Sequence, residues 1–204
     1  LSSFNRYIAL ANSGNEQPLT THADRYNINS AYSTSAYSKG AVFLAQLGYI
    51  IGKNNLIKTI KKYFTDFAFK HPTPNAIIRS AEKISGLELD WYLTEWTQTT
   101  KTIDYAIKNV TGNKVTLERK GSIPMPIDLI IEYTDGSKEY IYIPLQMARA
   151  EKENAYPKLT RIIKKDWAWA HPTYSFDTTK EIKSIQIDPS GLMADVDKTN
   201  NIYQ

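Results

Sequence analysis

The longest apolar run of the chain extends from Ala41 to Ile51 and contains one strongly polar residue, Gln46. A helix that is apolar on nearly every face is expected to be buried inside a protein. Ser35 can serve as the N-cap of this helix, and Gly52 is placed to end it. The pattern therefore predicts a central buried helix that presents Tyr37 in its first turn.

Further helices are expected on both sides of this run. Residues 1–11 and 53–67 show helical patterns, and Pro74 favours a helix start for residues 74–84. Residues 90–96 predict one more short helix. The polar stretch 13–29 contains glycine and proline and is predicted to be a loop. Short connections between these helices favour an antiparallel helical layer.

The hydrophobic period changes after Thr102 from helical spacing to alternation. Alternating stretches predict strands at residues 103–110, 115–119, 127–133, 139–143, 174–176 and 182–187. Short strands with regular turns favour an antiparallel β-sandwich of immunoglobulin-like type. We therefore predict an α+β chain, with a helical domain at residues 1–101 and a β-sandwich domain at residues 102–204.

The composition and charge of the chain exclude several classes of protein and of binding site. The chain has 204 residues with 42% hydrophobic residues, as expected for a globular protein of one or two domains. It has no cysteine, which excludes disulfides and thiolate metal sites. The net charge is only +4, and the lysines at 58, 61 and 62 fit a solvated helix face, so we expect no nucleic-acid partner. We expect no membrane span either, and the first residue, a leucine, suggests an excised fragment.

Several segments carry a family resemblance. Residues 37–41, Tyr-Ser-Lys-Gly-Ala, followed by an apolar helix, resemble the Tyr-x-Lys-Gly-Ala segment of the aminopeptidase N family. Residues 71–75 and 85–96 resemble the helical segment that follows in that family. Residues 102–105 and 124–126 resemble the start of its β-sandwich, and residues 188–189 and 200–201 resemble the end of bacterial members. Members are gluzincins, which are zinc metallopeptidases with a thermolysin-like catalytic domain. The resemblance covers nearly the whole chain and implies the C-terminal portion of such an enzyme, including the helical part of its catalytic domain.

The resemblance implies zinc in the parent enzyme but not in this segment. The family holds zinc with H-E-x-x-H, which places two imidazoles on one helix face. This chain has only His22, His71 and His171, and no two lie within one helical turn. The zinc ligands are therefore expected in an upstream catalytic region, which becomes the partner of this segment. The segment alone is expected to be inactive. The implied substrate is a peptide, and periplasm or cell surface is favoured over cytoplasm.

The resemblance also assigns a catalytic residue. It maps the transition-state tyrosine of the family onto Tyr37, whose phenol can donate a hydrogen bond to a developing oxyanion. Tyr32 and Asn29 lie on the approach to Tyr37 and are weaker candidates for substrate binding. Lys39 is expected to form a structural ion pair.

Two alternatives remain open from the sequence. One is a non-catalytic module that binds a peptide or glycan through the sandwich and its exposed aromatic residues. The other is a degenerate family member whose upstream zinc motif has been lost.

Overall fold

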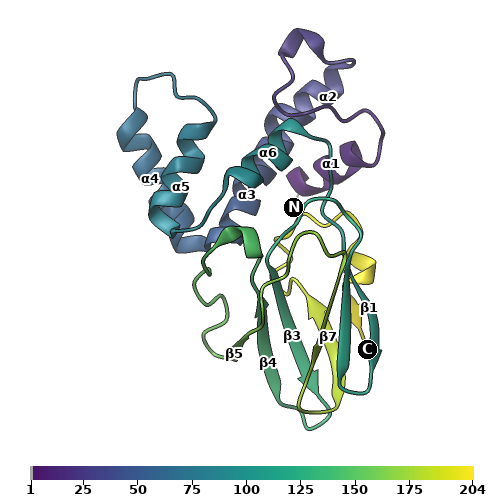
Figure 1. The fold of residues 1–204 in the computed structure, drawn as a ribbon. Coiled ribbons are helices and arrows are strands. Elements are labelled where there is room, and N and C mark those ends of the chain that lie inside the picture. Colours follow the sequence, from purple (N-terminus) through teal and green to yellow (C-terminus); the bar gives the residue numbers. More distant parts are fainter. Residues whose placement is uncertain (1) are drawn as a thin grey trace. The chain divides into compact units, whose positions relative to one another are not determined.

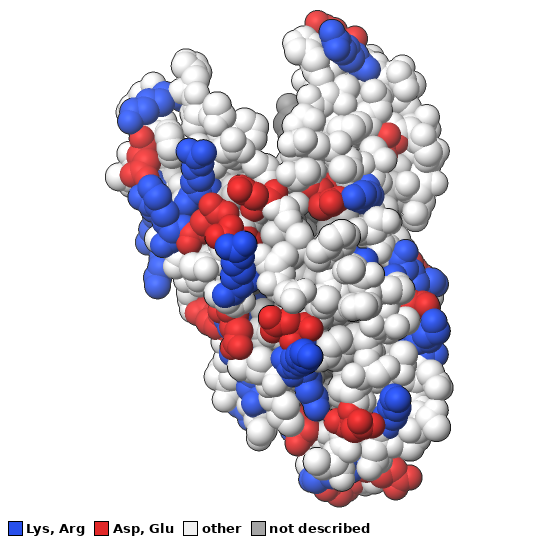
Figure 2. All heavy atoms as spheres, in the orientation of Figure 1, with Lys and Arg blue, Asp and Glu red and all other residues white. Residues whose placement is uncertain are grey.

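Helices occupy the first half of the chain, and strands occupy the second half (Figure 1). The computed structural model describes residues 2–204. The chain divides into two units, residues 1–101 with 148–153, and residues 102–147 with 154–204. None of the described helices is both long and apolar enough to cross a membrane. Basic and acidic side chains are interspersed over the face shown in Figure 2.

The first unit is helical, as predicted. Its α-helices are α1 (Ser2–Ala11), α2 (Asn29–Ser33), α3 (Gly40–Ile51), α4 (Lys53–Phe67), α5 (Asn75–Ser85) and α6 (Asp90–Gln98). Between α1 and α2 the chain is irregular except for the short 3₁₀ helix η1 (Ala23–Arg25). Gly86 ends α5 with φ of 73°, a conformation that glycine adopts without steric cost.

The central helix begins earlier than the sequence predicts. α2, a π-helical segment η2 (Thr34–Lys39) and α3 follow one another without interruption, so the helix extends over residues 29–51. Its N-cap is Ile28, whose side chain makes no capping hydrogen bond. Ser35 is therefore not the N-cap but a fully buried residue inside the helix. Tyr37 consequently lies about two turns inside the helix, and the prediction that places it in the first turn is wrong.

The apolar run is the buried centre of this unit, as predicted. Seven residues of α3 are buried: Val42, Phe43, Gln46, Leu47, Tyr49, Ile50 and Ile51. The Phe43 ring stacks on Tyr92 of α6 with centroids 5.1 Å apart, and the Tyr92 hydroxyl donates to the Phe43 carbonyl oxygen at 2.6 Å. Gly52 ends the helix with φ of 90°, which confirms its predicted role.

Residues 148–153 belong to the helical unit although they follow four strands in the sequence. The buried Lys152 donates to the Tyr49 carbonyl oxygen at 3.0 Å, and its ammonium lies 4.1 Å from the centroid of the Tyr49 ring. A carboxylate oxygen of Glu153 accepts from the Asn54 backbone N–H at 3.2 Å, in the first turn of α4. The favourable field at a helix N-terminus adds to this contact. These contacts attach a charged loop to the helices.

The second unit consists of two sheets. Its strands are β1 (Tyr105–Thr111), β2 (Lys114–Arg119), β3 (Ile127–Tyr133), β4 (Lys138–Ile143), β5 (Thr160–Ile163), β6 (Thr173–Asp177), β7 (Ile182–Ile187) and β8 (Ile202–Tyr203). The strand orders are β1-β2-β6 and β5-β4-β3-β7-β8. All pairs are antiparallel except β4 with β5, which is parallel and corrects the expectation of a purely antiparallel arrangement. The sequence also missed β5 and β8.

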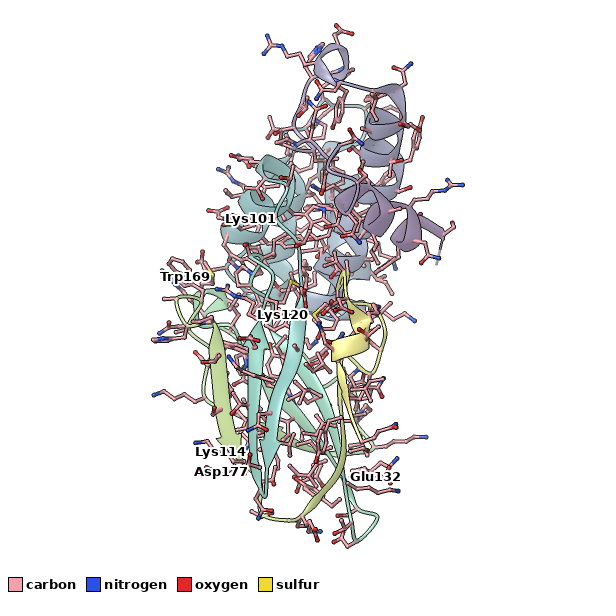
Figure 3. All side chains as sticks on the ribbon, turned by 90° about the vertical axis from the view of Figure 1, so that its right-hand side faces the viewer. Lys101, Lys114, Lys120, Glu132, Trp169 and Asp177 are labelled. Atoms are coloured by element: carbon pink, nitrogen blue, oxygen red, sulfur yellow. The ribbon has the colours of Figure 1, made fainter. Side chains whose placement is uncertain are left out.

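Both sheets contribute one face to a shared core. β1 contacts β7 and β8 across the two sheets. Buried apolar side chains come from both: Val115, Leu117 and Phe176 from one sheet, and Leu129, Ile131, Ile141, Ile185 and Ile187 from the other. Polar residues occupy strand ends; Lys114 of β2 lies opposite Asp177 of β6 in the antiparallel register (Figure 3). The observed class is α+β, with a helical part and two mainly antiparallel sheets.

Candidate functional site

The π-helical segment η2 interrupts the regular geometry of the central helix at Tyr37. The backbone N–H of Gly40 donates to the carbonyl oxygen of Ser35, five residues earlier, and also to the carbonyl oxygen of Tyr37. A π turn is rare, costs regular hydrogen bonding and occurs often at functional sites. Its presence here favours a functional reason for the local backbone.

Neighbouring side chains on η2 have opposite environments. Tyr37 is 78% exposed, whereas Ser38 and Lys39 are 4% and 1% exposed. An aromatic side chain that is exposed to solvent does not gain the free energy of apolar burial. Packing therefore does not explain the position of Tyr37. The phenol is free to contact a molecule outside the chain.

A pocket of about 280 Å³ lies beside Tyr37. One helical face of α2 and η2 supplies most of its lining, and α1 supplies a cation. The lining residues are Arg6, Ser30, Ser33, Thr34, Tyr37 and Ser38. Each of them carries a hydrogen-bond donor, and none carries a carboxylate. The pocket can therefore donate several hydrogen bonds to an anionic or carbonyl group.

The opposite face of η2 holds a buried ion pair. The Lys39 ammonium lies 2.7 Å from a carboxylate oxygen of Glu16, and both side chains are almost fully buried. The ammonium also donates to the Thr99 carbonyl oxygen at 3.4 Å and lies 5.8 Å from the Trp96 ring. This confirms the predicted ion pair and identifies its partner. The pair attaches η2 to the loop after α1 and to the end of α6.

Burial dominates the electrostatics of this ion pair. It raises the pKa of the Glu16 carboxyl above its ordinary value, and the Lys39 ammonium opposes that shift. Burial, followed by the charge of Glu16, also raises the pKa of the Tyr7 phenol. Within the described chain, the Tyr7 hydroxyl and the Trp96 indole N–H have no hydrogen-bond partner. The buried side of η2 is thus polar and sparsely hydrogen-bonded.

The other predicted site residues lie outside the pocket. Tyr32 is 43% exposed, and its ring lies against Tyr26 with centroids 5.5 Å apart. Asn29 is exposed at the start of α2. Their roles in substrate binding stay predictions.

Sequence reasoning missed Arg6 and the four hydroxyl residues of the pocket. The serines and threonine at 30, 33, 34 and 38 share the helical spacing of Tyr37, and this was the signal that could have revealed them.

No group of three or more His, Asp or Glu side chains in residues 2–204 is arranged to hold a metal ion. His22, His71 and His171 are exposed, and His22 instead accepts a hydrogen bond from the Asp24 backbone N–H at 3.3 Å. The donor set of the described residues does not fit zinc.

Comparison with known proteins supports one family. Residues 1–96 match the peptidase family M1 domain. No curated protein matches the chain. The crystal structure of Legionella pneumophila aminopeptidase A in complex with aspartic acid is similar over 83% of this chain, with 16% identity and a TM-score of 0.50. This chain spans only 18% of the length of that protein, and at this identity the likeness shows the fold alone. The family match confirms the resemblance of the sequence to peptidases of this family, and the structural match adds a shared fold.

Proposed function

We propose that the chain is the C-terminal portion of a zinc-dependent aminopeptidase, because residues 1–96 match the peptidase family M1 domain. In this proposal the chain supplies the catalytic tyrosine, Tyr37, and one wall of the active site. The observation that carries it is the 78% exposure of Tyr37 directly before α3, the buried centre of the helical unit.

The proposed role of Tyr37 follows from the chemistry of peptide hydrolysis. Attack on a peptide carbonyl places negative charge on the carbonyl oxygen. A phenol is a neutral donor near pH 7 and can give that oxygen one hydrogen bond. Tyr37 lies inside a continuous helix, so the field of a helix N-terminus does not contribute. Its effect therefore rests on position, which η2 and the buried Lys39–Glu16 pair hold in place.

Zinc belongs to the parent protein in this proposal. Its ligands would come from residues outside this chain, since the described residues offer no suitable donor set. The upstream catalytic region is then the partner of the helical unit, and a peptide is the substrate. We further propose that the two sheets form an immunoglobulin-like sandwich, because their strands are short, mainly antiparallel and share one apolar core.

The test is Tyr37→Phe in the full-length protein. The change removes one hydroxyl and keeps the ring, so folding and zinc content should be unchanged. Loss of one oxyanion donor typically lowers kcat by about 10²–10³, or about 3–4 kcal/mol. The measurement is kcat and KM on an alanyl anilide, together with a melting curve and a zinc count.

Three results would argue against this role. Normal kcat in the folded, zinc-loaded variant removes Tyr37 from the reaction. A raised KM with normal kcat assigns it to substrate binding alone. Absence of zinc from the wild-type full-length protein favours the degenerate family member.

The alternative of a binding module has weaker support. Trp169 is the exposed indole of the second unit at 56%, and it lies on a loop (Figure 3). A single exposed indole does not distinguish a glycan site from an ordinary surface residue.

A further inference from the structure

We propose that the pocket beside Tyr37 binds a carboxylate of the substrate, with Arg6 as the residue that selects it. The ligand class is a peptide that bears a carboxylate near the bond to be cleaved. This inference rests on the proposed function only where it identifies the ligand as a substrate.

The first support is the uncompensated charge of Arg6. Arg6 is exposed on α1 and lines the pocket. None of the ion pairs within residues 2–204 includes it, and the pocket lining supplies no carboxylate. A guanidinium presents donors in a planar fork that matches a carboxylate. The pocket therefore has one cation and no internal anion to neutralise it.

The second support is that the hydroxyl groups in the pocket do not donate to the backbone of their own helix. Serine and threonine inside helices commonly donate to the carbonyl oxygen four residues earlier. Ser80, Ser85 and Thr97 in α5 and α6 do so at 2.8, 2.8 and 2.6 Å. The four hydroxyls that line the pocket make no such hydrogen bond within the described chain. They are available to a ligand.

Ser38 is the clearest of these hydroxyls. It is only 4% exposed and still lines the pocket. Its hydroxyl oxygen is not among the fully buried atoms that lack a partner, so it is reached from the pocket side and can donate to a ligand there. A ligand oxygen in the pocket would accept that hydrogen bond.

These features together select the ligand class. A cationic group of a substrate would meet Arg6 and be repelled, and an apolar group would leave the hydroxyls unpaired. A carboxylate accepts from the guanidinium and from hydroxyls at once. Because Tyr37 lines the same pocket, a carboxylate bound there would lie close to the proposed reaction centre.

The first experiment measures binding directly. Succinate is titrated calorimetrically into the full-length protein, with succinamide as the uncharged analogue. The wild type should bind succinate more tightly than succinamide, and Arg6→Ala should weaken succinate binding by about 10- to 100-fold, as expected for a hydrogen bond to a charged group. Arg25→Ala removes the same charge from an exposed site outside the pocket and should leave affinity unchanged. No preference for succinate, or equal loss in both variants, would overturn the inference.

The second experiment identifies the source of the carboxylate. One pair of substrates is glutamyl anilide and alanyl anilide, and the other is trialanine with a free or an amidated C-terminus. Arg6→Ala should lower kcat/KM by about 10- to 100-fold for the charged member of one pair only. A loss confined to glutamyl anilide assigns the pocket to an acidic side chain. A loss confined to trialanine with a free C-terminus assigns it to a C-terminal carboxylate. Equal loss for charged and uncharged substrates would overturn it.

The two proposals can fail separately. Normal kcat of Tyr37→Phe on alanyl anilide, which has no carboxylate, would remove the proposed function. The succinate titration would still decide whether the pocket binds a carboxylate.

Discussion

Glu16 in the helical unit and Asp195 in the sheet unit are both buried carboxylates, yet their surroundings differ. Glu16 has one strong contact, the ion pair with Lys39 at 2.7 Å. Asp195 accepts from the backbone N–H groups of Tyr105 and Asp197, each at 2.9 Å, and from the Asn201 amide at 3.3 Å. The sheet unit thus holds its carboxylate with neutral local donors, whereas the helical unit relies on one opposite charge.

The difference indicates what each arrangement does. Asp195 joins the first strand to the C-terminal loops, which is a structural task that several short hydrogen bonds perform well. The Glu16–Lys39 pair instead lies directly behind the residues that present Tyr37. A lone buried pair is costly to form and fails when either partner is lost. It therefore fixes one arrangement of η2.

The largest expected effect is the loss of Lys39. Lys39→Ala leaves the Glu16 carboxylate buried without its cation, which should lower the free energy of unfolding by about 3–5 kcal/mol. Lys101→Ala is the matched control, because Lys101 pairs with Glu95 at the same distance of 2.7 Å but with 43% of the lysine side chain exposed. The control should cost less than about 1 kcal/mol. Urea unfolding of both variants makes the comparison, and similar losses would show that burial does not distinguish the two pairs.

The second prediction concerns pH and Asp195. Burial outweighs its hydrogen bonds and raises its pKa from 3.8 to about 6. Because the folded-state pKa lies above the unfolded one, the stability that this group contributes is fully present below pH 3.8. It is lost as pH rises through about 6, and the total change is about 3 kcal/mol.

The measurement is the free energy of unfolding of the wild type and of Asp195→Asn between pH 4 and pH 7. The amide does not titrate, so the stability of the wild type relative to the variant should fall as pH rises over this range. Other carboxyls are present in both proteins and cancel in the difference. A difference that stays constant with pH would mean that Asp195 keeps its ordinary pKa in the folded chain.

Strong periodic patterns made most elements predictable. The strands at 127–133 and 182–187 have the predicted bounds, and the helix at 53–67 does as well. β5 was not predicted because it has only four residues. Its partner β4 is also separated from it by a long stretch of sequence. Local patterns do not report such a distant pairing.

The resemblance picks out Tyr37, and its exposure agrees with the proposed role, which stays a prediction. The geometry around Tyr37 was not predictable from the sequence. Ser35 looked like a helix start by residue type, but the helix begins at Asn29 after an Ile28 without a capping side chain. The π turn and the Arg6 contribution depend on packing between α1 and η2, which no local pattern encodes.

The smallest expected effect concerns Ser38, which is 4% exposed and lines the pocket. Ser38→Ala removes a donor to the proposed ligand while Arg6 and the other pocket hydroxyls stay in place. Succinate affinity should fall by about 2- to 10-fold, or about 0.5–1.5 kcal/mol, with stability unchanged within about 0.5 kcal/mol. Ser80→Ala is the control, since Ser80 is equally buried in α5 but already donates to Ala76 and lies outside the pocket. It should leave succinate affinity unchanged. If Ser38→Ala instead destabilises the fold and leaves affinity normal, the Ser38 hydroxyl serves packing of η2, and the ligand is bound without it.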